Sequence, residues 1–135
     1  MKKYLFVDYD GTLVDDSVDC LFIDLYNRVG KDEALYQYEN GSIWKKKLRL
    51  NRSIIFKIFI KKIIGYKIIV FTNRFPIQKI NMLMNLGILQ YLFNDYIFGS
   101  GNKKDLKVNG ELWDNDPSYS QCAKQFKLVK TFKCN

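Results

Sequence analysis

Short apolar runs alternate with helical patterns along the chain, and this alternation predicts the elements of a parallel α/β sheet. The apolar runs are uninterrupted, which is typical of strands covered on both faces. We expect strands at Tyr4–Val7, Lys67–Phe71, Tyr96–Gly99, Glu111–Trp113 and Leu128–Phe132. The pattern therefore predicts a Rossmann-like three-layer α/β sandwich with a mainly parallel five-stranded sheet.

Apolar positions at helical spacing predict the helices between these strands. One series runs from Val18 to Val29, between Ser17 as a cap and Gly30 as a stop. Further helices are expected at Asp32–Glu39, Ser42–Leu50, Ser53–Ile64, Pro76–Leu86 and Pro117–Phe126. The helix from Ser53 is almost wholly apolar and its lysines share one side, so we expect only a narrow stripe of it to face water.

The connection between the first two strands is longer than a single crossover helix needs. We interpret residues 16–50 as a small helical insert, a cap that lies over one end of the sheet. No linker, internal repeat or low-complexity tract divides the chain, so residues 1–135 are expected to form a single domain.

Composition narrows the class of protein. Apolar residues make up 47% of the chain and aromatic residues 16%, which supports a folded core. Histidine is absent, which excludes Ser-His-Asp and Cys-His catalysis and any histidine metal site. The three cysteines are far apart and include no CxxC pair, which argues against a disulfide framework and a structural zinc. The most apolar window, Ile54–Phe71, contains four lysines and no segment is typical of a signal peptide, so we expect a soluble cytoplasmic protein with no membrane contact.

Two carboxylates follow the first apolar run, at the strand end where open α/β sheets bind ligands. Asp8 and Asp10 are two residues apart, so their side chains point the same way on an extended strand. Like charges buried side by side need a cation, and oxygen ligands without imidazole or thiolate suit Mg²⁺. Gly11 permits a tight turn whose backbone amides could face an anion.

The later strands deliver complementary groups at their carboxyl ends. These are Thr72, Asn73 and Arg74 after the second strand, Lys103 and Lys104 after the third, and Asp114 and Asp116 after the fourth. Successive strand ends thus supply carboxylates, a hydroxyl, a lysine and further carboxylates. A nucleophile, anion donors and a metal cage are the parts that phosphoryl transfer requires.

These segments resemble, in their order and spacing, the four motifs of the haloacid dehalogenase-like (HAD) hydrolase superfamily. DYDGTLVDD is similar to the first motif, IIVFTN to the second, Lys103 or Lys104 to the third, and LWDNDP to the fourth. The resemblance covers essentially the whole chain outside the insert. In this superfamily, dehalogenases lack the acid found here at Asp10, and members that resemble ion-pumping ATPases carry Thr there. The resemblance therefore implies a phosphatase or phosphomutase.

The resemblance also implies a role for each residue. Asp8 is expected to attack phosphorus and form an aspartyl-phosphate, and Asp10 to protonate the leaving oxygen and later deprotonate water. Thr72 and the backbone near Gly11 would hold phosphoryl oxygens, and Lys103 would offset their charge. The implied substrate-binding residues are Gly11, Thr12, Asn73, Arg74 and Lys104, and the implied Mg²⁺ ligands are Asp8, Asp10, Asp114 and Asp116.

The fourth motif departs from the family pattern, in which the two acids are adjacent or four residues apart. We expect Asp114 to be a metal ligand because it directly follows the apolar strand. Asp116 is either a second ligand or the cap of the next helix. The sequence does not separate Lys103 from Lys104 as the active-site lysine, and we favour Lys103. The short stretch of sequence between Lys103 and Asp114 resembles the compact arrangement of some 5′-nucleotidases.

Basic residues are unevenly distributed. The chain has 22 Lys and Arg against 14 Asp and Glu, and residues 40–107 contain fourteen basic and only two acidic residues. Within them, Trp44–Arg52 places five cations beside a tryptophan. This run is either a solvated helix face or a positive lip that attracts phosphorylated substrates, with Trp44 available for base stacking.

The leading interpretation is a Mg²⁺-dependent phosphomonoesterase that acts on a nucleotide, a sugar phosphate or a phosphoserine-like metabolite. One alternative is a polynucleotide 3′-phosphatase, since a small insert leaves room for a polymer at the site. Another is a catalytically inactive phosphate-binding protein of the same fold. A receiver-type signalling module is disfavoured, because its lysine follows its last acid whereas here the last acid follows the lysine. The oligomeric state stays open.

Overall fold

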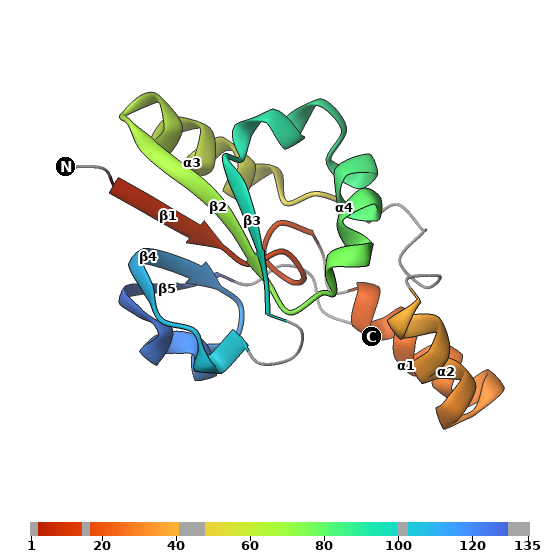
Figure 1. Ribbon diagram of the computed structural model, residues 1–135. Coiled ribbons are helices and arrows are strands. Elements are labelled where there is room, and N and C mark those ends of the chain that lie inside the picture. The colour runs from red at the N-terminus through yellow and green to blue at the C-terminus, as the bar shows by residue number, and fades with distance from the viewer. Residues whose placement is uncertain (1–2, 15–16, 41–47, 100–102, 130–135) are drawn as a thin grey trace.

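The sheet contains five strands in the order β3-β2-β1-β4-β5 (Figure 1). The computed structural model describes residues 3–14, 17–40, 48–99 and 103–129. The strands are β1 (Lys3–Val7), β2 (Tyr66–Thr72), β3 (Asp95–Phe98), β4 (Val108–Asp114) and β5 (Ala123–Leu128). All of their pairings are parallel, which confirms the predicted fold class.

Helices and 3₁₀ turns cover both faces of the sheet. On one face pack α3 (Arg52–Ile63), α4 (Lys79–Leu86) and the 3₁₀ turn η3 (Gly87–Leu92). The other face is covered by η5 (Pro117–Cys122), with η4 (Lys103–Asp105) beside it. A further 3₁₀ turn, η2 (Pro76–Gln78), leads into α4, so the helix expected from Pro76 begins as a 3₁₀ turn.

Alternate side chains of the central strands point to opposite faces and build two cores. Leu5 and Val7 pair in register with Ile68 and Val70, and these residues lie in the larger core with Ile58 of α3. The buried members of the second core are Phe6, Phe71, Leu112 and Cys122. Because both faces of these strands are buried, the strands appear in the sequence as continuous apolar runs.

Two helices, α1 (Ser17–Val29) and α2 (Lys31–Glu39), follow β1 and form a hairpin beyond the carboxyl ends of the strands (Figure 1). The chain reverses at Gly30, whose φ of +88° favours glycine. The ring of Tyr38 fixes the hairpin to the body, because it makes edge contacts with Phe22 of α1 and with Phe75 at centroid distances of 5.6 and 6.2 Å. Gln78 of η2 adds a hydrogen bond of 2.9 Å to the Tyr38 carbonyl.

Residues 48–51 lead into α3 beside the loop that follows β1. Leu50 forms an antiparallel bridge with Val14, and the Asn51 amide donates to the Leu13 carbonyl at 2.8 Å. The helix expected at Ser42–Leu50 is absent from residues 48–50, and residues 41–47 lie outside the described residues. None of the described helices is long and apolar enough to span a membrane.

The last strand lies earlier in the chain than predicted. The helix expected at Pro117–Phe126 is wrong, because η5 ends at Cys122 and β5 follows at once. Of the strand expected at Leu128–Phe132, Leu128 is the last residue of β5, Val129 lies outside it, and residues 130–132 lie outside the described residues. With β5 at Ala123–Leu128, Phe126 packs against the second core, and the lysines of this strand are exposed at the edge of the sheet. Only Ala123 and Phe126 of this edge strand are partly buried, with polar residues between them, so it lacks the uninterrupted apolar run used to find the others.

α3 exposes more apolar surface than predicted. Only Ile54 and Ile58 of this helix are buried, whereas Phe56, Phe59 and Ile63 are exposed. The expectation that only a narrow stripe faces water is therefore wrong, because the described elements cover the inner side of α3 alone.

Candidate active site

The carboxyl ends of three neighbouring strands meet at one edge of the sheet, because β1 lies between β2 and β4 and is parallel to both. Asp8, Thr72 and Asp114 are brought together there, and η4 adds Lys103 from the turn after β3. All four side chains are buried. The structure thus gathers residues that the sequence predicted as catalytic or metal-binding from four separate segments.

Lys103 lies between two carboxylates. Its ammonium nitrogen is 2.9 Å from Asp8 Oδ1 and 2.5 Å from Asp114 Oδ2, and the side chain is only 1% exposed. The ring of Tyr119 lies 4.7 Å from the same nitrogen. Lys104, in contrast, is exposed. The structure therefore places Lys103, and not Lys104, against the carboxylates.

Burial and charge act on the pKa values of this cluster in opposite directions. Burial raises the pKa of Asp8 to about 8, against the lowering effect of Lys103, and the nearby Asp114 and Asp10 raise it further. Burial lowers the pKa of Lys103, but the two carboxylates outweigh burial and leave that pKa raised. The positive charge of Lys103 thus does not fully offset the negative charge of the buried carboxylates. A second cation would be stabilised beside them.

Asn115 marks a point on which three oxygen atoms converge. With its amide oriented to donate, as these acceptors require, Nδ2 lies 2.8 Å from Asp8 Oδ2, 3.1 Å from Asp114 Oδ1 and 3.2 Å from the Asp10 carbonyl oxygen. No three Asp, Glu, His or Cys side chains form a metal cluster in the described part of the chain. The three oxygens that converge on Asn115 come from two side chains and one backbone carbonyl. All three are ligands of the kind that Mg²⁺ binds.

Arg74 holds the Asp10 carboxylate with two hydrogen bonds. Its Nε donates to Oδ2 at 3.0 Å and its Nη2 donates to Oδ1 at 2.7 Å. The guanidinium is 3% exposed and lies 4.6 Å from the ring of Tyr9, while the Asp10 side chain is 24% exposed. A bidentate pair fixes the orientation of the carboxylate as well as its charge. Arg74, which was expected to bind substrate, is directed at Asp10 in this structure.

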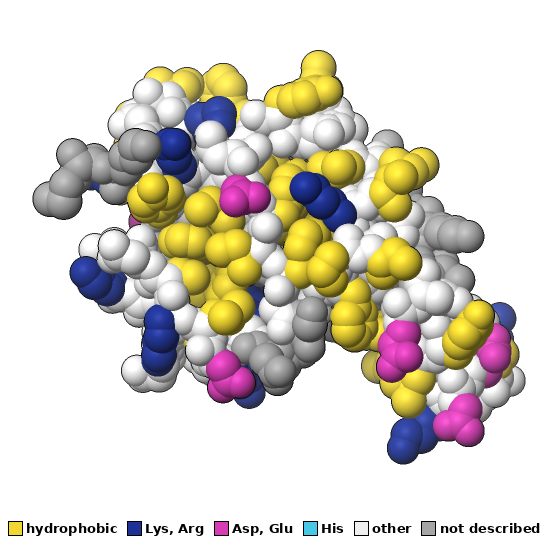
Figure 2. All heavy atoms as spheres, viewed as in Figure 1, with side chains coloured by type: hydrophobic (Ala, Val, Ile, Leu, Met, Phe, Trp, Pro, Cys, Tyr) yellow, Lys and Arg dark blue, Asp and Glu magenta, His cyan; other side chains and the backbone are white. Residues whose placement is uncertain are grey.

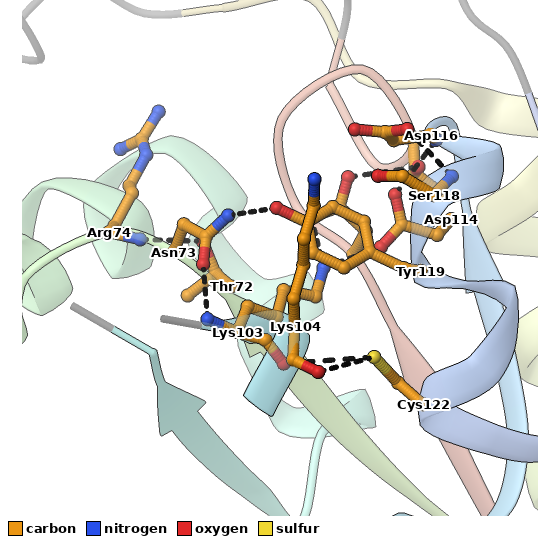
Figure 3. Close-up of polar contacts among 12 residues, drawn as sticks. Thr72, Asn73, Arg74, Lys103, Lys104, Asp114, Asp116, Ser118, Tyr119 and Cys122 are labelled. Carbon is orange, nitrogen blue, oxygen red and sulfur yellow. Dashed lines mark hydrogen bonds and ion pairs between the residues drawn. The ribbon is translucent and has the colours of Figure 1, made fainter. Parts of the chain in front are cut away.

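Asn73 connects the lysine turn to η5 (Figure 3). Its Oδ1 accepts from the Lys103 amide at 3.1 Å, and its Nδ2 donates to the Tyr119 hydroxyl at 2.5 Å. Cys122 adds a weak hydrogen bond of 3.4 Å from its thiol to the Lys104 carbonyl. The contacts that the structure shows for Asn73 position Lys103, and its expected role in binding substrate stays a prediction.

Asp116 caps the 3₁₀ turn η5. Its Oδ1 accepts from the Ser118 amide at 2.9 Å, and its own amide donates to Asp114 Oδ1 at 3.0 Å (Figure 3). Its carboxylate is not among the oxygens that converge on Asn115. Of the two roles considered for Asp116, the structure shows the cap, and the role as a ligand stays a prediction.

The turn after β1 is closed by its own backbone. Gly11 has a φ of +80°, and the amides of residues 12–14 all donate to the Tyr9 carbonyl, at 3.3, 3.0 and 3.1 Å. Thr12 is buried, and its hydroxyl donates to Asp8 Oδ2 at 3.3 Å. Of the predicted binding residues in this turn, Thr12 therefore contacts the expected nucleophile directly.

Sequence reasoning missed three residues that shape the site, namely Asn115, Tyr119 and Tyr9. Asn115 could have been noticed, because it stands between the two acids of the fourth motif. The contacts of Tyr119 with Lys103 and of Tyr9 with Arg74 depend on how distant segments pack, and no local pattern indicates them.

Solved structures with a similar fold cover most of the chain. A chain of the Pnkp1/Rnl/Hen1 complex matches 98% of it with a TM-score of 0.61 and 19% identity, and the present chain spans about half of that longer one, 48%. A dehalogenase matches 87% with a TM-score of 0.56 and 11% identity, over 78% of its own length. The HAD domain of the effector protein Lem4 from Legionella pneumophila matches 96% with a TM-score of 0.51 and 16% identity, over 86% of its length.

These likenesses concern the fold, because all of the identities are low. At the level of sequence, no family model and no curated protein matches the chain. The chain has the fold of a dehalogenase and of a HAD domain, which is the fold that the resemblance of its four motifs implied.

Proposed function

We propose that the protein is a magnesium-dependent phosphomonoesterase that forms an aspartyl-phosphate on Asp8. The observation that carries this proposal is the contrast between two carboxylates only two residues apart. Asp8 is buried against Lys103, and its Oδ2 is one of the three oxygens that converge on Asn115. Asp10, in contrast, is partly exposed and is held by Arg74. Two acids in two environments suit a nucleophile and a separate acid/base.

In the first step, a carboxylate oxygen of Asp8 attacks phosphorus, and the bond between phosphorus and the ester oxygen breaks. The electron pair of that bond goes to the leaving oxygen, which takes a proton from Asp10. Lys103, 2.9 Å from Asp8, and the buried hydroxyl of Thr72 offset the negative charge on the transferred group.

In the second step, Asp10 accepts a proton from a water molecule whose oxygen attacks the phosphorus atom. The bond between phosphorus and Asp8 breaks, inorganic phosphate leaves, and the Asp8 carboxylate is restored. Arg74 acts as a positioning residue, because its bidentate contact fixes Asp10 in one orientation for both proton transfers.

The donor set at Asn115 fits a magnesium ion, held by Asp8, Asp114 and the Asp10 carbonyl. When bound, Mg²⁺ would supply positive charge to the buried acids and to the phosphoryl oxygens. The raised pKa of Asp8 supports this assignment, because burial and the neighbouring Asp114 disfavour its negative charge, and a bound cation would offset both effects.

Asp10 favours ester hydrolysis over dehalogenation. A halide leaves without a proton, whereas an alkoxide needs one, so an acid beside the nucleophile is useful only for the second kind of leaving group. The resemblance to the HAD superfamily agrees, because its dehalogenases lack an acid at this position.

The substrate class that we propose is a small phosphate ester, with a nucleotide placed first. Tyr119 and the exposed Lys104 lie beside Lys103, so a base could stack on an aromatic ring next to positive charge. The basic run Trp44–Arg52 supports a nucleotide substrate less than expected. Arg49 and Arg52 line an apolar groove on another face, and residues 45–47 lie outside the described residues.

A 3′-phosphorylated nucleic-acid end is a second candidate substrate. It is favoured by the small size of the hairpin α1–α2, which is joined to the body through Tyr38 and leaves Asp10 partly exposed. The likeness to a chain of the Pnkp1/Rnl/Hen1 complex concerns the fold and does not decide between the two candidates.

Phosphate release with Mg²⁺ over a panel of nucleotides, sugar phosphates, phosphoamino acids and 3′-phosphorylated oligonucleotides tests this proposal. We expect release that stops with EDTA and has its highest kcat/KM on nucleotides. A higher value on oligonucleotides would select the second candidate. If neither the panel nor a generic aryl phosphate is hydrolysed, the catalytic proposal is wrong, and a phosphate-binding protein of the same fold remains.

A further inference from the structure

The outer side of α3 and the turn η3 line an open apolar groove of about 760 Å³. Its most exposed apolar side chains are Phe56, Ile88 and Tyr91, of which Ile88 is 83% exposed. Figure 2 shows apolar side chains at the surface over these elements. A concave apolar surface of this kind is typical of a site that another protein segment covers.

Within the described part of the chain, the charged side chains that line this groove are basic. They are Arg49 and Arg52, and no described acidic residue lines it. The sequence of residues 48–64 contains five basic and no acidic residues. The matching occupant is therefore a segment that is apolar on one side and acidic at its edge.

The hairpin α1–α2 has this composition. Its exposed apolar side chains in the described part of the chain are Ile23, Tyr26, Val29, Leu35 and Tyr36. Residues 17–40 contain five acidic and two basic residues, and Asp32 and Glu33 are exposed in the first turn of α2. Figure 2 shows acidic and apolar side chains interleaved on the surface of the hairpin.

None of the residues that line the groove belongs to the hairpin, so the hairpin does not fill the groove of its own chain in this structure. The hairpin extends beyond the carboxyl ends of the strands, whereas α3 and η3 pack on one face of the sheet (Figure 1). We propose that the hairpin α1–α2 of one copy docks, head to tail, into the α3–η3 groove of a second copy. Groove-to-groove pairing would instead bring Arg49 and Arg52 of two copies together, and this repulsion disfavours it. If each of two copies docks its hairpin into the groove of the other, the assembly closes as a dimer. If docking runs in one direction only, further copies add and a longer oligomer forms.

Sedimentation at increasing protein concentration tests the groove. The wild-type chain should self-associate in the micromolar range at near-physiological ionic strength, and Arg49→Glu/Arg52→Glu should weaken self-association about tenfold or more. The matched control Lys107→Glu/Lys124→Glu changes the net charge equally on the face near η5 and should have little effect. A wild-type chain that stays monomeric, or an equal loss in the control, would overturn the proposal.

Mixing two charge-reversed variants tests the pairing itself. The groove variant Arg49→Glu/Arg52→Glu and the hairpin variant Asp32→Lys/Glu33→Lys should each self-associate weakly, because hairpin and groove then have the same sign. In their mixture every hairpin faces a groove of opposite sign, so association should return to near the wild-type level. A mixture no stronger than either variant alone would contradict head-to-tail docking, and circular dichroism of each variant confirms that it is folded.

Discussion

Two regions of this molecule place their side chains in opposite ways. At the carboxyl edge of the sheet, charged groups are buried and pair with one another, as Lys103 does with Asp8 and Asp114. In the α3–η3 groove, large apolar groups such as Phe56 and Ile88 stand in solvent. Neither arrangement favours folding, since buried ion pairs lose hydration and exposed apolar groups gain no burial. Sites that break the ordinary rules of burial in this way are where function is expected.

After loss of the nucleophile Asp8 itself, the largest effect is expected at the acid/base pair of the polar region. Asp10→Asn should lower kcat on alkyl esters such as nucleotides by about 10²–10⁴-fold, and much less on aryl phosphates, because an aryl oxide leaves without a proton. Arg74→Lys keeps the charge but not the bidentate contact, so it should give a smaller loss of the same kind. Steady-state kinetics on both ester types checks this. Equal losses on the two esters in Asp10→Asn would remove Asp10 from the acid role.

Metal binding should separate the two acids of the fourth motif. Asp114→Asn should weaken Mg²⁺ binding by more than about 100-fold, because it replaces one of the converging carboxylates with a neutral amide. Asp116→Asn is the matched control, since asparagine can still cap η5, and it should change the affinity by less than tenfold. Calorimetric titration with MgCl₂ measures both. The reverse ranking would transfer the ligand role to Asp116.

On one helix, the comparison between buried and exposed apolar groups can be made directly. Ile58→Ala should destabilise the fold by about 2–5 kcal/mol, because it leaves a cavity in the larger core. Phe56→Ala, in the groove, should change monomer stability by about 0.5 kcal/mol or less. Denaturation at low protein concentration checks both values. A large loss for Phe56→Ala would mean that the groove contributes to the core and is not an open surface.

Asp8 should make the stability of the metal-free protein depend on pH. Its pKa is about 8 in the folded state, above the ordinary 3.8, so the folded chain keeps a proton that the unfolded chain has lost. The contribution of Asp8 is therefore full below about pH 4, falls as the pH rises to about 8, and is level above that. Asp8→Asn lacks this slope and should gain stability relative to wild type as the pH rises. Urea denaturation with EDTA between about pH 5 and pH 8 measures the difference, and parallel profiles would contradict it.

Much of the polar region could be predicted because its residues follow strands that are continuous apolar runs. Asp8 directly follows β1, and Thr72 and Asp114 are the last residues of β2 and β4, so the parallel topology alone brings them together. The pairing of Arg74 with Asp10 could not be predicted in the same way. It depends on side-chain orientations at two adjacent strand ends, for which the sequence contains no periodic signal.

The groove and β5 were missed for different physical reasons. The composition of α3 is that of a buried helix, and composition cannot show whether another element covers it, so Phe56 and Ile63 were expected inside. In β5, Phe126 is flanked by lysine and glutamine, as suits an edge strand, and the apolar run predicted for the last strand was placed too late. Both errors arise where a segment is covered on one side only.

The central claim is a covalent phosphoryl group on Asp8. It is tested most directly by mixing the protein with an aryl phosphate and Mg²⁺, quenching in acid within one turnover, and measuring the mass of the peptide that contains Asp8. We expect a fraction of that peptide to gain one phosphoryl group, which hydroxylamine removes, and we expect none in Asp8→Asn, whose turnover should be lost. Phosphate release without this adduct at any time, or an Asp8→Asn variant with a tenth of the wild-type activity, would contradict the mechanism.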